Sequence, residues 1–193
     1  MQPEISIEQF VTGVLHIQST PAVKKLVNCG KILHLKKKEI IFLQGYVPEH
    51  VAFLLNGIIR SFVIADKGVD VTECFDFEYG WPVVPSIPLN APASVNAEAS
   101  VESDLIVFPV KDVWKLIETN IDVSHMYNLL LCQSMAKYVQ FSRVMMTCSA
   151  EQKYQWFCKE YAAVNGKVSS KEIASFLNIS PGRLSKIRGS LKQ

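Results

Sequence analysis

The sequence predicts an α+β protein in which an N-terminal roll of short antiparallel strands is followed by a long helix and a C-terminal helix-turn-helix. The roll is indicated by Gly45, Gly57, Gly68 and Gly80, which recur at intervals of 12, 11 and 12 residues between β-rich runs. One strand and one turn occupy about this length in a sandwich or barrel. Residues 121–147, which contain no Gly or Pro, predict the long helix, and capping residues near the C-terminus predict the helix-turn-helix.

Composition excludes several classes of protein. Of the 193 residues, 49% are hydrophobic and 20% are charged, with only 9 Gly and 9 Pro, which excludes disordered and collagen-like chains. No apolar run reaches the length of about 18 residues that a membrane span needs. Glu4 and Glu8 stand where a secretory signal would be basic and then apolar. We therefore expect a cytoplasmic protein with no membrane partner.

Two short helices are expected before the roll. Apolar residues at helical spacing predict the first over residues 5–18, and Pro21 precedes a second over residues 22–28. From Lys31 onward the pattern changes to short β-rich runs, which predict a roll of seven or eight strands. These runs are residues 32–35, 40–43, 51–55, 58–64, 69–77, 95–101 and 105–108.

Two of the β-rich runs, residues 69–77 and 95–101, alternate between apolar and polar side chains. This pattern predicts antiparallel strands with one buried face and one face in solvent. The apolar members are Val69, Val71, Phe75 and Phe77 in the first run and Val95, Ala97, Ala99 and Val101 in the second. Between the runs, four prolines at positions 82, 85, 88 and 92 predict an irregular loop, because proline is excluded from helix interiors and central strands.

The predicted helix over residues 121–147 would be about 40 Å long. Its apolar residues occupy most of the circumference, and such a helix needs a cover on more than one face. We expect the roll to cover one face and a second copy of the chain to cover another. The alternative is a central helix buried within the monomer.

The C-terminal part of the chain is helical and basic. Ser149 and Gln152 have the spacing of a capping box, which predicts a new helix after a hinge at residues 147–149. We expect that helix to end at Asn165-Gly166, where the backbone would enter the left-handed region. Residues 1–150 carry 12 Lys and Arg against 15 Asp and Glu, whereas residues 151–193 carry 8 against 3.

The last two predicted helices have the capping residues and the short turn that are typical of a helix-turn-helix. Ser169 or Ser170 is expected to cap the first, and Ser180-Pro181 to begin the second, which runs to Lys192. Between them, Asn178 tolerates the left-handed conformation of a tight turn. Ala174 is small where two crossing helices must approach closely.

The outward face of the final helix has the composition of a surface that binds DNA. At 100° per residue, Leu184 and Ile187 point into the domain, while Gly182, Ser185 and Lys186 point away from it. Short side chains allow close approach to a major groove, Ser and Lys can reach base edges, and flanking cations can meet phosphates. The candidate DNA-binding residues are Ser180, Pro181, Gly182, Arg183, Ser185, Lys186, Arg188 and Lys192. An ordinary helical hairpin with a solvated basic face is the alternative.

The stretch SKEIASFLNISPGRLSKIR over residues 170–188, with the roll and the long helix before it, resembles the Crp/Fnr superfamily of bacterial transcription regulators. It is particularly similar to the short Bacteroidetes-type members. The resemblance implies a cyclic-nucleotide-binding-like double-stranded β-roll, a form of jelly roll, as the sensor in residues 1–120. It also implies a dimerisation helix in residues 121–147 and a DNA-binding domain in residues 148–193. The implied partners are a second copy of the chain, a pseudo-palindromic site on double-stranded DNA and, as a further candidate, RNA polymerase.

The resemblance fails at the residues that bind the nucleotide in the family. There, Gly-Glu binds the ribose, and Arg followed by Ser or Thr binds the phosphate. In this sequence Gly80 is followed by Trp81 instead of Glu, and Ala93-Ser94 stand near the position of the family's Arg-Ser or Arg-Thr pair. No Lys or Arg occurs between Lys67 and Lys111. Because a buried phosphate without a cation is costly, we predict that cyclic AMP is not the ligand.

A different ligand is one of two expectations for this region. The candidate residues of an apolar pocket are Trp81, Val83, Val84, Ile87, Ala93 and Ser94. A filled core without a ligand is the other expectation. In the family's recognition helix, Pro181 and Gly182 fall at base-contact positions that carry long side chains, so the resemblance implies a different DNA specificity here.

Other functions stay open as alternatives. The chain could be a small-ligand sensor module that acts through protein partners, with a purely structural helix-turn-helix. A roll-type metalloenzyme is disfavoured, because the four His and five Cys residues lack the spacing of metal ligands. We therefore expect no metal, no cofactor and no catalytic residues, and we expect the cysteines to be reduced.

Overall fold

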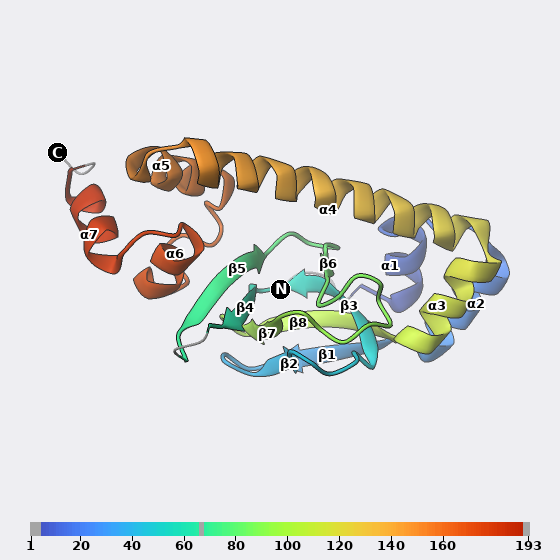
Figure 1. Cartoon of the computed structure of the whole chain (residues 1–193). Coiled ribbons are helices and arrows are strands. Elements are labelled where there is room, and N and C mark those ends of the chain that lie inside the picture. The colour runs from blue at the N-terminus through green and yellow to red at the C-terminus, as the bar shows by residue number, and fades with distance from the viewer. Residues whose placement is uncertain (1–4, 66–67, 191–193) are drawn as a thin grey trace.

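The computed structural model describes residues 5–65 and 68–190 and has two antiparallel sheets with helices at both ends (Figure 1). The helices are α1 (Ile7–Gly13), α2 (Thr20–Cys29), α3 (Val110–Thr119), α4 (Ile121–Thr147), α5 (Ala150–Glu160), α6 (Ser170–Phe176) and α7 (Pro181–Ser190). The strands are β1 (Lys31–Leu35), β2 (Ile40–Phe42), β3 (His50–Asn56), β4 (Ile59–Ile64), β5 (Asp70–Asp76), β6 (Pro82–Val83), β7 (Asn96–Ala99) and β8 (Ser103–Pro109). The seven predicted β-rich runs are all present as strands, and β6 is an additional short strand within the proline-rich segment. No helix in the described part of the chain is long and apolar enough to cross a membrane.

The two sheets enclose one apolar core. Their strand orders are β1-β8-β3-β6 and β2-β7-β4-β5, and all of the pairings are antiparallel. Side chains from both sheets meet between them. The buried members are Leu35, Phe42, Ala52, Leu54, Ile59, Val83, Ala97, Ala99, Leu105 and Val107.

The regularly spaced glycines lie where the backbone adopts positive φ, as their turn role requires. Gly57 has a φ of +104°, and a Cβ there would lie 2.6 Å from the Cα of Ser103. Gly80 has a φ of +76°, and a Cβ there would lie 2.5 Å from the side chain of Val14. The predicted spacing therefore marks real turns, and at these two positions the packing also excludes a side chain.

The predicted faces of β5 and β7 are correct in part: Phe75, Ala97 and Ala99 are buried as expected, but the first half of β5 and the polar face of β7 are not as predicted. In β5 the register with β4 shifts between Cys74 and Thr72, and this bulge reverses the alternation, so that Val71 is exposed and Thr72 is 3% exposed. In β7 both faces are buried, including Asn96 and Glu98. The polar face of this strand is buried because α6 covers that side of the sheet and ion pairs neutralise Glu98.

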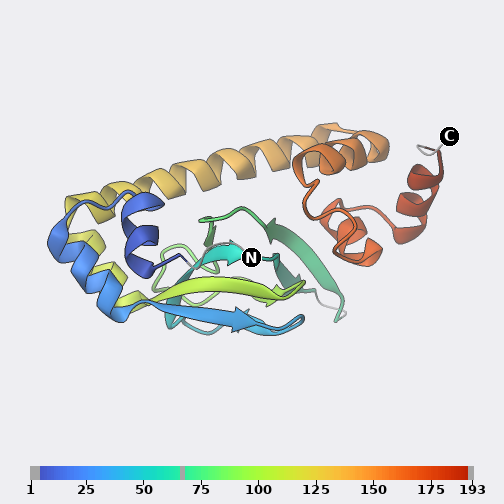
Figure 2. The same cartoon turned by 180° about the vertical axis from the view of Figure 1, so that it is seen from behind.

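Helix α4 begins and ends where the sequence predicted, and it runs along one side of the roll from α3 to α5 (Figures 1 and 2). Asn120 caps its N-terminus by accepting a hydrogen bond from the N–H of Val123. The alternative of a helix buried within the monomer is wrong: Met135 is 63% exposed and Met146 is 82% exposed. One face of α4 packs on the roll and on α3, and the opposite face is open in the single chain.

Helix α5 starts with the predicted capping box of Ser149 and Gln152, but it ends at Glu160 rather than at Asn165-Gly166. Tyr161 forms the C-cap, and its ring lies 5.3 Å from that of Phe77 in the roll and 5.0 Å from that of Phe176 in α6. The chain then passes through turns that include Gly166 at a φ of +88°. Burial of the Tyr161 ring therefore accompanies an earlier end of the helix than the Asn-Gly pair predicts.

Candidate nucleic-acid interface

Helices α6 and α7 are joined by the predicted tight turn. Ser169 caps α6 in a capping box with Glu172. Asn178 adopts a φ of +52°, and the N–H of the next residue donates to the carbonyl of Ala174 at 3.0 Å. The hydroxyl of Ser180 accepts from the N–H of Arg183 at 3.2 Å, which caps α7. Ala174 is fully buried, as the close approach of the two helices requires.

The two faces of α7 differ as the sequence predicts. Leu184 and Ile187 are 1% and 2% exposed and pack against α5 and α6. The opposite face is exposed and consists of Pro181, Gly182, Ser185, Lys186 and Gly189. A Cβ added at Gly182 or Gly189 would meet no described atom within 4 Å. The fold itself therefore does not require these glycines, although each lowers helix stability by about 1 kcal/mol relative to Ala.

The basic residues of α7 differ in their partners. Arg183 forms an ion pair with Glu151 of α5, and Arg188 is half-buried and bonded to Tyr154 and Ser170. Lys186 is exposed, and its ammonium has no hydrogen-bond or ion-pair partner among the described residues. Ser180 lies exposed beside this face, and Lys192 lies outside the described residues.

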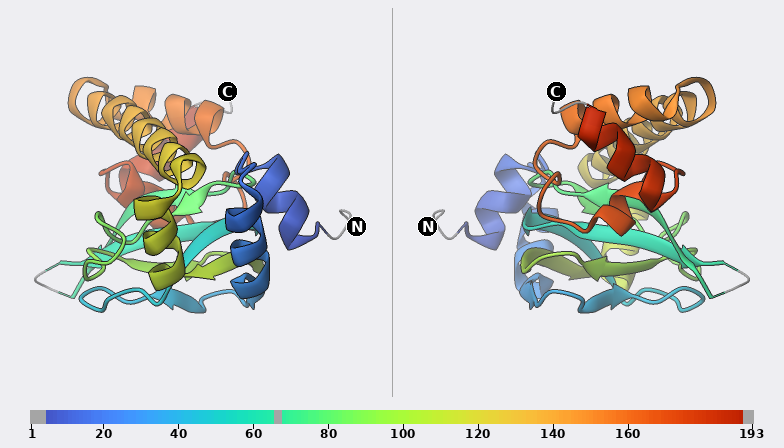
Figure 3. Two further views of the ribbon diagram at one scale, coloured as in Figure 1. Left: turned by 90° about the vertical axis from the view of Figure 1, so that its right-hand side faces the viewer. Right: turned by 90° about the vertical axis from the view of Figure 1, so that its left-hand side faces the viewer.

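The helix pair is attached to the roll through α6, which packs on the outer face of β5 (Figure 3). The ring of Phe176 lies 5.3 Å from Phe75 of β5 and 5.0 Å from Phe141 of α4. The hydroxyl of Ser175 accepts a hydrogen bond from the N–H of Thr72 at 2.9 Å. Phe75 and Ile58 of the roll thus share one apolar core with the C-terminal helices.

A buried ionic network accompanies this contact. Arg60 of β4 is 2% exposed, and it donates to Glu98 at 2.9 Å, to Thr72 at 3.0 Å and to Asp70 at 3.2 Å. Lys38 donates to Glu98 at 2.8 Å and to Glu172 of α6 at 2.7 Å. Burial raises the pKa of Glu172, but hydrogen bonds from Lys38 and Ser169 outweigh it, so the pKa lies below the usual value for Glu.

Sequence reasoning missed this network. Its signal is Arg60, the one charged residue in the β-rich run 58–64; Glu98 gave no signal, because the alternation of residues 95–101 placed it on the face predicted to lie in solvent. A charged side chain in such a run is rarely buried unless it is paired.

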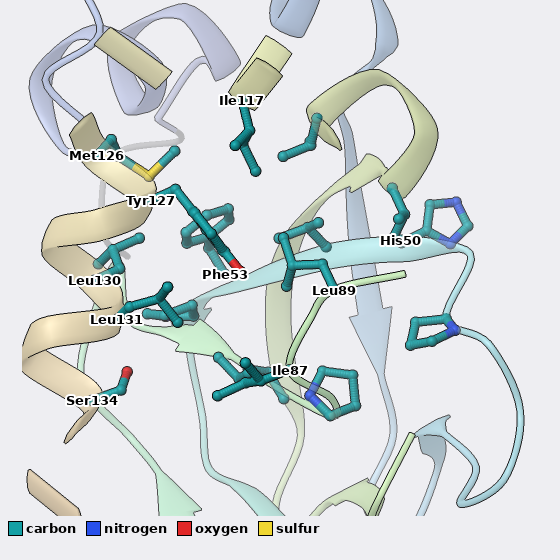
Figure 4. A pocket seen from close by; sticks show the side chains of 18 residues that line it. His50, Phe53, Ile87, Leu89, Ile117, Met126, Tyr127, Leu130, Leu131 and Ser134 are labelled. Carbon is teal, nitrogen blue, oxygen red and sulfur yellow. The ribbon is translucent and has the colours of Figure 1, made fainter. Parts of the chain in front are cut away.

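A separate apolar cavity lies between the roll and α4 (Figure 4). From α4, Met126, Tyr127 and Leu130 point toward Phe53 and Leu89 of the roll side. The other residues that line the cavity are Pro48, His50, Val51, Pro82, Val83, Val84, Pro85, Ile87, Val110, Val113, Ile117, Leu131 and Ser134. None of the lining residues in the described chain is Lys or Arg.

Three of the six predicted pocket residues, Val83, Val84 and Ile87, line this cavity. The other three do not. The ring of Trp81 lies 3.5 Å from the ammonium of Lys137 on α4, which also pairs with Glu78. Ala93 is 4% exposed and bonds through its backbone to Gly45 and Tyr46. The N–H and hydroxyl of Ser94 both donate to the carbonyl of Pro85, which closes the loop.

Sequence reasoning also missed the contribution of α4 to the cavity. The apolar residues of that helix were predicted to contact the roll, but the sequence has no signal that pairs Tyr127 or Leu130 with particular loop residues. The described residues contain no group of three or more His, Cys, Asp and Glu side chains that could hold a metal ion.

Comparison with known proteins identifies the fold. No protein-family model and no curated protein sequence matches the chain. FixK2 from Bradyrhizobium japonicum superposes with a TM-score of 0.75 at 15% identity over 84% of this chain and 84% of that chain. A putative transcriptional regulator of the Crp/Fnr family from Eubacterium rectale gives 0.72 at 16% identity over 91% of this chain and 84% of that chain. The c-di-GMP responsive global regulator CLP from Xanthomonas campestris gives 0.69 at 11% identity over 90% and 92%. The chain therefore has the fold of the Crp/Fnr-type regulators along most of their length.

Proposed function

We propose that this protein is a homodimeric transcription regulator of the Crp/Fnr type that binds a specific site on double-stranded DNA. In this proposal residues 1–120 form the sensor, residues 121–147 the dimerisation helix and residues 148–193 the DNA-binding domain. The observation that carries the proposal is the outward face of α7, which combines exposed glycines that the fold does not require with an unpaired lysine, within the described residues. The fold shared with known regulators supports it.

The chemistry of this face suits a major groove. Gly182 and Ser185 allow the helix backbone to approach the bases, and the hydroxyl of Ser185 can donate or accept a hydrogen bond. Lys186 extends from the same face and can reach a guanine edge or a phosphate. Ser180, Pro181 and Arg183 lie at the start of the helix, next to the DNA backbone in this geometry.

A dimer would place two such helices in successive major grooves, about 34 Å apart. The exposed face of α4 supports a dimer contact, because Ile121, Met135, Val139 and Met146 follow one another along it and are 47–82% exposed. Apolar residues at this spacing form a stripe along one side of a helix. Pairing of two α4 helices would remove that stripe from water.

The direct test of the binding face compares Lys186→Ala with Lys24→Ala in fluorescence-anisotropy titrations of a selected DNA site. Lys24 is an exposed lysine of α2, at the end of the molecule far from α7 (Figure 1). We expect Lys186→Ala to weaken binding by about tenfold or more, since a base contact contributes about 1–3 kcal/mol. Lys24→Ala should bind like the wild type. Equal binding by all three proteins would contradict the assignment of this face.

We further propose that the effector, if the protein has one, is apolar and uncharged, because the cavity lining carries no cation for a phosphate. Cyclic AMP should then leave the thermal unfolding temperature unchanged, whereas an apolar ligand that fills the cavity should raise it. Stabilisation by cyclic AMP would contradict this part of the proposal.

A second candidate function is a ligand sensor that acts through protein partners, which the cavity alone would support. The variant Arg183→Ala/Lys186→Ala separates the two functions, because it should abolish DNA binding and leave ligand-induced stabilisation intact. A wild-type protein that is stabilised by a ligand but binds no duplex would favour the second function.

A further inference from the structure

Helix α7 has few apolar anchors for a helix that must be held at a defined angle. Within its described residues, Leu184 and Ile187 are the buried side chains, and they lie on one face. Two apolar contacts on one face hold a helix against its neighbours but restrict its rotation only weakly, because apolar burial is not directional. A directional contact, such as a hydrogen bond, is therefore needed near one end of α7 to fix its rotation.

Arg188 supplies such a contact in the last turn of α7. Its Nε donates to the hydroxyl of Tyr154 in α5 at 3.0 Å, and its Nη1 donates to the hydroxyl of Ser170 in α6 at 2.6 Å. The guanidinium carbon also lies 5.4 Å from the centre of the Tyr154 ring. Tyr154 is only 7% exposed, so the acceptor is fixed in the core. The rigid, planar guanidinium thus joins α7 to both neighbouring helices.

The other cations of α7 lack such fixed contacts. The pair between Arg183 and Glu151 is about half exposed on both sides, and exposed pairs of this kind exchange readily with water or a phosphate. The ammonium of Lys186 has no partner within the described chain. Arg188 differs because its Nε donates to the hydroxyl of the buried Tyr154, while its Nη1 donates to the hydroxyl of Ser170, which is exposed.

We propose that Arg188 is a positioning residue that sets the orientation of α7 on the domain, rather than a residue whose main role is to contact DNA. This inference rests on the proposed function. In this inference the exposed face around Lys186 determines which DNA sequence is bound. The contact of Arg188 with Tyr154 and Ser170 sets the angle at which that face enters the groove.

The two roles predict different dependence on salt. Loss of a phosphate contact weakens binding to all sequences and reduces the slope of log K against log salt by about one unit. Loss of a positioning contact leaves the number of phosphate contacts unchanged and lowers the preference for the specific site. The distinction can be measured without knowing the natural target, on a duplex selected from random DNA.

The decisive variant is Tyr154→Phe/Ser170→Ala, which keeps the Arg188 charge and removes both of its acceptors. We expect its ratio of specific to non-specific affinity to fall by about tenfold, because hydrogen bonds from a charged group are stronger than those between neutral groups, with an unchanged salt slope. Arg188→Met should show the same loss. Tyr46→Phe, at an exposed tyrosine of the roll, is the matched control and should behave like the wild type.

Amide hydrogen exchange of the full-length free protein gives a second readout that does not need DNA. In Tyr154→Phe/Ser170→Ala, amides of α7 should exchange faster, whereas those of the roll should not change. An unchanged specificity ratio with unchanged exchange in α7 would overturn the proposal, as would a salt slope that falls in Arg188→Met while the double variant binds like the wild type. If the wild type binds no duplex at all, the proposed function fails, and the exchange comparison still tests the positioning contact.

Discussion

The guanidinium of Arg60 is 2% exposed and lies between the roll and α6, where Glu98, Thr72 and Asp70 satisfy its donors. A buried ion pair is not by itself a large source of stability, because both charges must be removed from water. Removing one member of the pair lowers the free energy of unfolding, since the charge of the other member stays buried without its partner. The network therefore makes the stability of the protein sensitive to single substitutions at this contact.

We predict that Arg60→Met lowers the free energy of unfolding by about 3–5 kcal/mol, because Glu98 stays buried with one cation fewer. Urea unfolding followed by far-UV circular dichroism measures the change. The control is Lys25→Met, which removes the exposed ion pair with Asp112 and should have little effect. A loss in Arg60→Met as small as that in the control would show that the network does not stabilise the fold.

Asp76 gives a prediction about pH. Burial at the end of β5 raises the pKa of its carboxyl from 3.8 to about 7, against smaller lowering effects of Cys74 and Lys137. The folded protein thus holds a proton on Asp76 that the unfolded chain has released, so stability from this group declines as the pH rises from about 4 to about 7. Asp76→Asn should be the more stable protein above pH 7, and its advantage should disappear near pH 4. A stability difference that does not depend on pH would contradict the raised pKa.

At the scale of the elements, local sequence patterns predicted most of the fold. The bounds of α4, the turn at Asn178 and the glycine turns follow from signals confined to a few residues. The burial of β7 on both faces does not, because it depends on α6 and on Arg60 of β4, a strand that is paired with β7 but far from it in the sequence. The end of α5 at Glu160 likewise accompanies the packing of Tyr161 on Phe77, which is far away in the chain. The bulge in β5 lies in the hairpin with β4, and the alternation of residues 69–77 gives no signal for it.

The same limit applies to the candidate sites. The faces of α7 were predictable because helical periodicity alone sorts Leu184 and Ile187 from Gly182 and Lys186. The partners of Arg188 were not, since Tyr154 and Ser170 lie on other helices. The cavity was predicted in part, because Trp81 and Ser94 do not line it: the Trp81 ring contacts the ammonium of Lys137, and Ser94 donates to the backbone carbonyl of Pro85.

The exposed stripe on α4 gives the prediction at this scale. We expect the wild type to sediment as a dimer and Val139→Glu to sediment as a monomer, because a carboxylate would be buried without a partner at the centre of the proposed contact. Gln133→Glu adds the same charge at an exposed position of α4 away from the stripe and should remain a dimer. Sedimentation equilibrium distinguishes these outcomes, and a dimeric Val139→Glu would place the contact elsewhere.

At the scale of the whole molecule, α4 and α6 connect the roll to the C-terminal helices by two separate routes. Helix α4 lines the cavity at one end and contacts Phe176 through Phe141 at the other. Helix α6 contacts the roll directly through Phe75 and the Arg60 network. The cavity and α7 are therefore joined by packed elements, because α4 contacts α6 and α6 in turn contacts α7.

Selection of duplexes from random DNA at moderate salt tests the central claim most directly. A dimer that places two α7 helices in successive grooves should enrich an inverted repeat whose half-site centres are separated by one helical turn, about 10 base pairs. Enrichment of no sequence, or of a single half-site without its inverted copy, would contradict the account.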